Sequence, residues 1–246
     1  MTPPATSPST PPDTVIYAIG DVHGRCDLLE QLVARIVRDA AARRAGKRLL
    51  VLLGDYVSRG ISSRRVIEML LAPPPAGFER IALRGNHEDL WLRYLAGDLD
   101  AGRHWFDYDG LDVLADYGVD VGDRSRRDTA TVEGWRECFA AVLPADHLAF
   151  VRSTPASHRS GDYLFAHAGV RPGVPIAQQE ASDLMWIRQP FIGSTLDHGA
   201  VVVHGHCIVD RPELRANRIG IDTGAFRSGV LSCVALEGAR RDILQT

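Results

Sequence analysis

Hydrophobic residues follow two different spacings in the first third of the chain. Short apolar runs, each ending in glycine or a polar residue, predict buried strands at 15–19, 49–53 and 78–83. Between these runs, apolar residues recur every three or four positions, which predicts amphipathic helices at 26–44 and from Ser62 or Ser63 onward. Because strand and helix alternate, we expect a parallel central sheet.

The rest of the chain changes from helical to strand-like spacing. Helical periodicity predicts helices at 88–95, 105–117, 132–142 and 144–150. We expect this block to form a cap beside a cleft, with its aromatic residues in packing rather than in substrate contact. Short apolar runs then predict strands at 156–159, 163–166, 200–203, 218–221, 230–235 and 242–244. These strands are expected to form an antiparallel second sheet packed on the first.

Size and composition indicate a single domain at residues 13–246. The 246 residues are 45% hydrophobic, which allows a substantial core. Residues 1–12 are rich in Pro, Ser and Thr and have neither a basic start nor an apolar stretch, so they predict a disordered tail rather than a secretory signal. No apolar run approaches the roughly 18 residues that a membrane span requires.

The net charge bears on which binding partners we expect, and the cysteine content bears on the cellular compartment. The formal net charge of -3 gives no reason to expect nucleic acid or an anionic membrane as a partner. The 4 cysteines contain no Cys-x-x-Cys pair and are too sparse for a disulfide scaffold, so we expect a reducing cytoplasm. None of these features carries a signal of oligomeric state.

Side chains able to bind metal follow the ends of five predicted strands. They are Asp21, His23, Asp55, Asn86, His167 and His206. Because the carboxyl ends of parallel strands meet at one edge of a sheet, we expect them to converge there. Oxygen and imidazole donors without thiolates are typical of a two-metal hydrolytic site rather than a structural zinc site. Two ions about 3.5–4 Å apart need a shared carboxylate, and Asp55 is the expected bridge.

Three short motifs then carry a family resemblance. In chain order they are Gly20-Asp21-Val22-His23-Gly24, Gly54-Asp55-Tyr56-Val57-Ser58-Arg59-Gly60 and Gly85-Asn86-His87-Glu88. With two later histidine motifs, the chain resembles the phosphoprotein phosphatase branch of the metallophosphoesterases over about residues 16–224. The resemblance implies a calcineurin-like α/β fold, a four-layer α/β/β/α sandwich with mixed sheets and a helical cap. It also implies two divalent metal ions, with manganese expected and iron or zinc equally suited to these donors.

The resemblance further implies roles for three cationic side chains. Arg59 and Arg188 match the two arginines that bind the substrate phosphate, a role suited to a planar, bidentate guanidinium. His87, directly after Asn86, matches the general acid that protonates the leaving oxygen.

The remaining histidines and one carboxylate have less specific roles. His206, and not His204, matches the last metal ligand. His104, His147, His158 and His198 are expected at the surface. Asp222 either supports a metal-ligating histidine or caps the turn before Gly224, and both roles stay open.

Ser58 departs from the protein phosphatase pattern, which has an aspartate at this position that orients the general-acid histidine. A serine accepts a hydrogen bond from an imidazole but cannot stabilise the imidazolium with a full charge. Three explanations compete: a slower general acid, a substrate whose leaving group needs little protonation, and a replacement engineered into the natural sequence. Symmetrical dinucleoside polyphosphate hydrolases are similar in all these motifs and also lack the aspartate.

We therefore expect a cytoplasmic enzyme that hydrolyses phosphomonoesters by direct attack of a metal-bridging hydroxide. Its expected substrates are phosphoserine and phosphothreonine in proteins, with a small phosphoester also possible. The alternative within the family is a symmetrical dinucleoside polyphosphate hydrolase. An alternative of another class is a non-catalytic binding module with the same fold, against which the complete set of ligand types argues.

Overall fold

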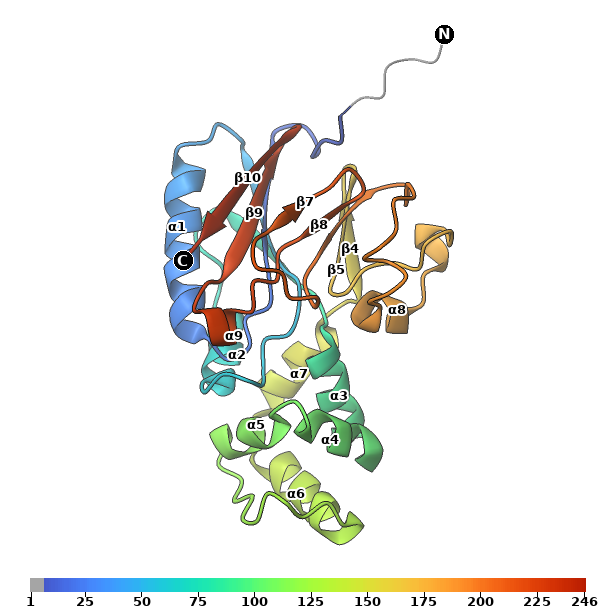
Figure 1. Cartoon of the computed structure of the whole chain (residues 1–246). Coiled ribbons are helices and arrows are strands. Elements are labelled where there is room, and N and C mark those ends of the chain that lie inside the picture. The colour runs from blue at the N-terminus through green and yellow to red at the C-terminus, as the bar shows by residue number, and fades with distance from the viewer. Residues whose placement is uncertain (1–6) are drawn as a thin grey trace.

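Two five-stranded sheets packed face to face form the body of the molecule, which the computed structural model describes for residues 7–246 (Figure 1). The first sheet has the strand order β10-β9-β1-β2-β3. Its strands are β1 (Thr14–Ile19), β2 (Lys47–Leu52), β3 (Phe78–Ala82), β9 (Ser232–Glu237) and β10 (Arg240–Gln245). The pairs β1–β2 and β2–β3 are parallel, as the alternation of strand and helix predicts, whereas β9 is antiparallel to both β1 and β10.

The second sheet has the order β4-β5-β6-β8-β7. Its strands are β4 (Ser157–Ser160), β5 (Tyr163–Ala166), β6 (Val201–His204), β7 (Glu213–Leu214) and β8 (Arg218–Gly220). The pairs β4–β5 and β7–β8 are antiparallel, whereas β5–β6 and β6–β8 are parallel. The second sheet is therefore mixed, as the family resemblance implies, and not antiparallel throughout as the strand pattern predicted. Parallel neighbours need a long crossover, and residues 167–200, with helix α8 (Ala181–Trp186), supply one. The last two predicted strands also belong elsewhere, since as β9 and β10 they extend the first sheet.

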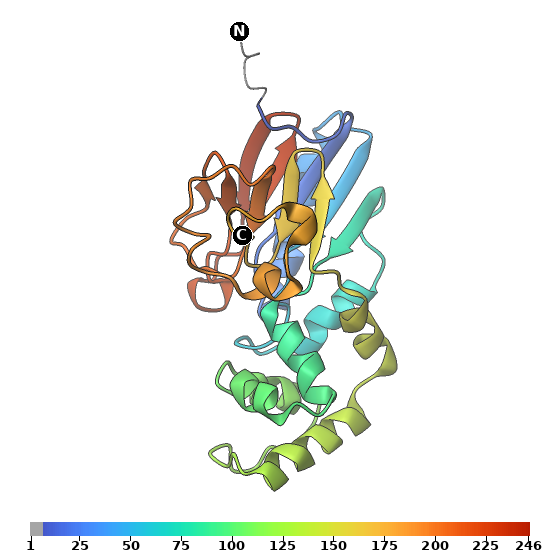
Figure 2. The same ribbon diagram turned by 90° about the vertical axis from the view of Figure 1, so that its right-hand side faces the viewer.

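Helices cover both outer faces of the paired sheets. Helices α1 (Cys26–Ala41) and α2 (Ser63–Leu71) connect the first three strands and pack on one face of the first sheet, where Tyr17 is buried. Ile16, the neighbour of Tyr17, points the opposite way into the core between the sheets. On the far side, Leu184 of α8 packs against residues of the second sheet. Figure 2 shows the ribbon of α8 in orange on this side of the molecule. The four-layer α/β/β/α sandwich is therefore confirmed.

Five helices between β3 and β4 form the predicted cap, in the lower part of Figure 1. They are α3 (Asn86–Leu95), α4 (Leu99–Phe106), α5 (Gly110–Asp116), α6 (Thr129–Val142) and α7 (Ala145–Ser153). Trp91 and Trp105 are fully buried and stack with ring centroids 6.2 Å apart, which confirms a packing role for these aromatics. The single helix predicted at 105–117 is instead two helices, because Asp109 takes a left-handed φ of 62°.

The segment expected to be a tail contacts both sheets where the structure describes it. Residues 1–6 lie outside the described residues. Thr10 N donates to Gly238 O (3.1 Å), in the turn between β9 and β10, and the Tyr163 hydroxyl donates to Pro8 O (3.2 Å). Residues 8–10 are thus tied to the sheets, which differs from the disorder predicted for them.

None of the helices described for residues 7–246 has the length and apolar character needed to span a membrane.

Candidate metal centre

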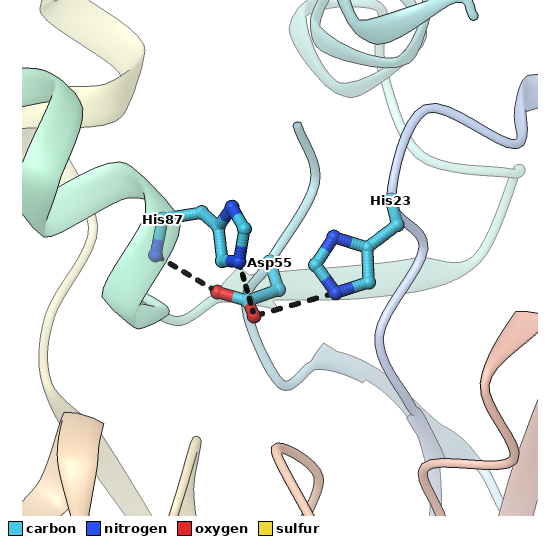
Figure 3. Close-up of side chains that lie close together, drawn as sticks. All are labelled: His23, Asp55 and His87. Atoms are coloured by element: carbon cyan, nitrogen blue, oxygen red, sulfur yellow. Dashed lines mark hydrogen bonds and ion pairs between the residues drawn. The ribbon is translucent and has the colours of Figure 1, made fainter. Parts of the chain in front are cut away.

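The predicted donors meet at the carboxyl edge of both sheets, with Asp55 at the middle. Its Oδ2 lies 3.5 Å from His23 Nε2, 3.4 Å from His167 Nε2 and 3.8 Å from His87 Nε2. Figure 3 shows the carboxylate of Asp55 between the rings of His23 and His87. Two groups of donors, His23–Asp55–His87 and Asp55–His167–His206, are each close enough to hold one ion. Asp55 belongs to both groups, as expected for a bridging carboxylate, although His87 of the first group is the residue predicted to be the general acid rather than a metal ligand.

The other predicted donors border the second group. Asn86 Oδ1 lies 2.8 Å from His167 Nε2, and His206 Nδ1 lies 3.2 Å from the same nitrogen. His167 Nδ1 faces the carbonyl oxygen of Leu53 at 3.0 Å, and since a carbonyl only accepts, Nδ1 carries the proton. Nε2 therefore presents a lone pair to Asn86 Oδ1. Two acceptors this close are stabilised by a cation between them.

Asp21 and His206 leave polar atoms free at the site. Asp21 Oδ2 accepts a hydrogen bond from His206 N (3.0 Å), while Asp21 Oδ1 and His206 Nε2 are buried without a hydrogen-bond partner among residues 7–246. Buried polar atoms normally have partners, so unpaired ones need an explanation. Together with a donor set made only of oxygen and imidazole nitrogen, they fit a pair of divalent metal ions.

Burial sets the charge state of the donors. It raises the pKa of Asp21 and of Asp55 well above the usual range, and the carboxylates of Asp222 and Glu88, respectively, raise them further. Burial also lowers the pKa of His23 to about 4 and that of His206 to about 3, so both imidazoles are neutral at pH 7. Neutral imidazoles are the form that binds metal, and bound cations would favour ionised carboxylates.

The site backbone is unusual in its φ angles. Left-handed values occur at His23 (45°), Asp55 (51°), Ser58 (69°), Arg59 (65°) and His206 (61°). Such values are uncommon for residues other than glycine and cluster at functional sites, where the surrounding structure holds them. The turns that follow β1, β2 and β6 therefore direct His23, Asp55, Arg59 and His206 into the cleft.

Two positions must be glycine because their Cα atoms lie very close to the carboxylates of Asp55 and Asp21. A Cβ atom on Gly85 would lie 2.1 Å from Asp55 Oδ1, and one on Gly205 would lie 1.9 Å from Asp21 Oδ1. Neither distance is tolerable for a side chain, so both motif glycines make room for the carboxylates.

Glu88 holds the turn after β2, a role that the sequence analysis missed. Its buried carboxylate accepts hydrogen bonds from the backbone N–H groups of Asp55 (2.8 Å), Tyr56 (2.8 Å) and Gly85 (3.0 Å). A glutamate three residues after the N-cap is the second half of a capping-box signal, and Gly85 has no side chain to supply the first half. That pattern identifies the contact with Gly85 but not the contacts with the distant turn.

Ser58 does not contact His87 as the sequence analysis considered. Its Oγ accepts a hydrogen bond from Trp105 Nε1 of the cap (2.9 Å), and its N–H donates to Ser63 Oγ (3.0 Å). His87 Nδ1 is buried without a partner among residues 7–246. The hydroxyl of Ser58 is thus bonded to a tryptophan of the cap. The Nδ1 atom of His87 has no hydrogen-bond partner among residues 7–246 that would orient the ring.

Two other polar residues follow strand ends, and only one of them, Asp222, lines the cleft. His204 is buried away from the cleft, with Nδ1 3.0 Å from Gly205 O and Nε2 3.3 Å from Arg218 Nη1. Asp222 lines the cleft, and its Oδ1 also accepts from Gly224 N (2.8 Å), so it does cap that turn.

The surface prediction for two histidines is wrong. His147 is buried against Tyr117, whose hydroxyl lies 2.8 Å from its Nδ1, and His198 is buried beside Phe191. His104 is exposed, as predicted, but it also lines the cleft.

A cavity of about 550 Å³ opens above the donors. Its wall includes both predicted phosphate-binding arginines. The guanidinium of Arg59 lies over the rings of Tyr108 (5.4 Å) and Phe226 (4.9 Å), and Arg188 Nη1 is 3.5 Å from His206 O. Five other lining residues were not predicted from the sequence, which are His104, Tyr108, Trp186, Ile208 and Arg227.

Comparisons with known proteins agree on the family, whereas the named activities of the relatives differ. The family described as calcineurin-like phosphoesterases matches residues 14–220. Serine/threonine-protein phosphatase 2 of Salmonella typhimurium is 28% identical over 225 residues, which cover 88% of this chain and 90% of that protein. The symmetrical bis(5'-nucleosyl)-tetraphosphatase of Dechloromonas aromatica is 30% identical over 156 residues, which cover 63% of this chain and 44% of that protein. A crystal structure provisionally described as a diadenosine tetraphosphatase has a TM-score of 0.62 at 18% identity and covers 98% of both chains.

Proposed function

This chain belongs to the calcineurin-like phosphoesterase family, and from that premise we propose that it hydrolyses phosphoserine and phosphothreonine in proteins. It is a metal-dependent phosphoesterase, and its relatives are named as a phosphatase and a tetraphosphatase. The relative with 90% coverage is a serine/threonine-protein phosphatase, which supports a phosphoprotein substrate. The observation that carries the proposal is a single carboxylate, that of Asp55, shared between two groups of metal donors.

Six side chains would hold the metal ions in this proposal, which are Asp21, His23, Asp55, Asn86, His167 and His206. When bound, two divalent cations supply a water molecule of lowered pKa and neutralise charge on the phosphoryl oxygens. Manganese is the proposed ion.

The cleft arginines would bind the phosphoryl group. Arg59 and Arg188 line the same cavity as the donors and form no salt bridge among residues 7–246, so their N–H groups are available to phosphoryl oxygens. The rings of Tyr108 and Phe226 support the guanidinium of Arg59 without neutralising it. Phosphoryl transfer depends mainly on such positioning and charge neutralisation.

His87 would give a proton to the leaving oxygen. The imidazole lies beside Asp55 and lines the cavity, where an ester oxygen of the bound substrate can reach it. Because no carboxylate among residues 7–246 lies behind its Nδ1, the imidazolium lacks the support that a carboxylate provides.

That last observation favours a second candidate, the symmetrical hydrolysis of dinucleoside polyphosphates. The leaving group is then a nucleoside phosphate, which needs less protonation than the alkoxide of serine. The Dechloromonas aromatica relative carries this activity in its name.

The compartment is part of the same proposal. All four cysteines, Cys26, Cys138, Cys207 and Cys233, are free, which supports a reducing cytoplasm.

A parallel assay separates the candidates. Purified protein, stripped and then titrated with manganese, iron or zinc, would receive an aryl phosphate, a phosphoserine peptide and diadenosine tetraphosphate. We expect hydrolysis of the aryl phosphate and the peptide, and loss of both activities in Asp55→Asn. Fast cleavage of the dinucleotide alone would overturn the phosphoprotein proposal in favour of the second candidate.

A further inference from the structure

Three guanidinium groups, not two, line the cavity above the donors. Arg59 and Arg188 correspond to the phosphate-binding pair, and Arg227 is the third. Among residues 7–246, none of the three forms a salt bridge, although many other arginines of this chain are paired with carboxylates. The cavity therefore holds one cationic side chain more than the proposed chemistry uses.

Arg227 is held at the edge of the cavity by its short helix. It lies on α9 (Ala225–Ser228), which follows Gly224, a residue with a left-handed φ of 64°. A Cβ atom on Gly224 would lie 3.2 Å from Arg227 Nε and 3.2 Å from Ile208 Cγ2. The stem of Arg227 thus packs back across the glycine, beside Ile208, which also lines the cavity.

A single phosphoryl group does not need a third guanidinium. Two arginines provide two planar forks of N–H donors, which can satisfy the non-bridging oxygens of one phosphate. The cavity volume of about 550 Å³ falls in the range of roughly 300–1,000 Å³ typical of sites for larger ligands, so there is room beyond one phosphoryl group.

We infer that Arg227 binds a second anionic group of the substrate, next to the phosphate that is hydrolysed, and so selects substrates that carry two neighbouring anions. The inference rests on the proposed phosphoesterase site, and it deepens that proposal by naming a substrate feature. The second anion has two chemical sources, the carboxylate of an acidic residue beside a phosphoserine and the next phosphate of a polyphosphate chain.

The test compares ligands with one and two anionic groups. Methylphosphonate carries one, phosphonoacetate adds a carboxylate, and methylenediphosphonate adds a second phosphonate. Each is titrated calorimetrically into the full-length protein at a constant excess of manganese, and each is also assayed as a competitive inhibitor of aryl phosphate hydrolysis. The variants are Arg227→Gln and the matched control Arg211→Gln, which removes an exposed arginine that does not line the cavity.

We expect Arg227→Gln to weaken at least one two-anion ligand by about 10-fold, with less than about a 2-fold effect on methylphosphonate. Arg211→Gln should change none of the ligands by more than about 2-fold. The ligand that loses affinity identifies the source of the second anion. Equal losses for all three ligands, or no loss for any, would overturn the inference.

Failure of the proposed function would be distinguishable from failure of this inference. If no phosphoester is hydrolysed, the proposed function fails, while the calorimetric affinities still decide the role of Arg227. Because the side chain of Arg227 is exposed, its replacement should leave the midpoint of urea unfolding unchanged, and that measurement verifies the fold of the variant.

Discussion

Asp55 combines a left-handed backbone with a carboxylate that faces three imidazoles. A left-handed residue other than glycine costs of order 1 kcal/mol, and aspartate tolerates it better than most. The hydrogen bond from Asp55 N to Glu88 offsets part of that cost. A residue in the centre of the site is therefore positioned by contacts outside it.

Ser58 illustrates a second residue whose role depends on a distant partner. In Ser58→Ala, the indole N–H of Trp105 loses its acceptor in a fully buried position. Leaving a buried donor unpaired costs about 1–3 kcal/mol, so we expect the free energy of unfolding to fall by that amount. Urea unfolding of the variant measures it.

Trp105→Phe provides the control for Ser58. The Trp105→Phe protein has no indole N–H to leave unpaired. Adding Ser58→Ala to it should therefore lower the free energy of unfolding by less than about 0.5 kcal/mol. An undiminished cost would show that the hydrogen bond is not what makes Ser58 stabilising.

At the element scale, the first turn of α3 joins the cap to the metal centre. Asn86, His87 and Glu88 lie in one helical turn after β3 and point to different partners. His87 N donates to Asp55 Oδ1 (3.1 Å), and Glu88 accepts from the turn after β2. The start of one helix therefore holds both the carboxylate predicted to bridge the metal ions and the turn that supports it.

Glu88→Gln should weaken both the fold and the binding of metal. One amide nitrogen would face backbone N–H groups that now donate to a carboxylate oxygen. We expect a loss of at least about 2 kcal/mol in stability and a fall of about 10- to 100-fold in manganese affinity. Urea unfolding and calorimetric metal titration measure the two effects. Glu30→Gln, on the exposed face of α1, should change neither, and an equal effect there would contradict a specific role for Glu88.

Arg43, just after the end of α1, forms ion pairs with α1 and with strands β9 and β10 of the first sheet. Its guanidinium bonds Asp39 (2.5 Å), Glu237 (3.0 Å) and Asp242 (2.8 Å). Although burial acts in the opposite direction, hydrogen bonds from Arg43 hold the pKa of Asp39 and of Asp242 below the usual value. A folded-state pKa below the unfolded one stabilises the fold above about pH 4, and the effect is lost as the pH falls further.

Arg43→Gln should therefore destabilise the fold in a pH-dependent way. We expect a loss of about 1–2 kcal/mol at pH 7, since the carboxylates are partly exposed. The difference from the parent protein should shrink near pH 3, where the carboxyl groups are protonated in both. Thermal unfolding at the two pH values measures it, with Arg38→Gln on the exposed face of α1 as control. A difference that does not depend on pH would argue against the ion pairs as its source.

At the scale of the whole molecule, the donors come from the carboxyl ends of strands in both sheets. Asp21, Asp55 and Asn86 follow strands of the first sheet, whereas His167 and His206 follow strands of the second. The centre forms only when the two sheets are packed, so a metal that bridges the groups binds the folded state alone.

Metal removal should therefore lower the stability of the entire domain. At a free manganese concentration about 100-fold above the dissociation constant, binding adds about 2.7 kcal/mol. We expect the midpoint of thermal unfolding to rise when manganese is added to stripped protein and to fall when the metal is chelated. The rate of aryl phosphate hydrolysis should rise and fall in the same way. Asp55→Asn should lose most of this rise. A midpoint unaffected by manganese in the parent protein would contradict a metal centre at the sheet interface.

The sequence by itself determined most of the strands, the helical character of the cap and the positions of the donors at the strand ends. These follow from local patterns: an apolar run that ends in Gly-Asp is a buried strand with a carboxylate at its end, and parallel strands bring such ends together. The structure brings the donors together, and all of them except the fully buried His167 line one cleft, although their roles as ligands stay a prediction.

Only the tertiary structure decided which sheet receives each late strand, what Ser58 and Glu88 contact, and that Arg227 faces the cavity. Trp105 lies 47 positions from Ser58 along the chain, and Glu88 lies 33 from Asp55. Strand pairing and long side chains bring into contact residues that lie far apart along the chain and belong to different sequence motifs. Their contacts depend on the packing of the whole chain, and no spacing of hydrophobic residues encodes them.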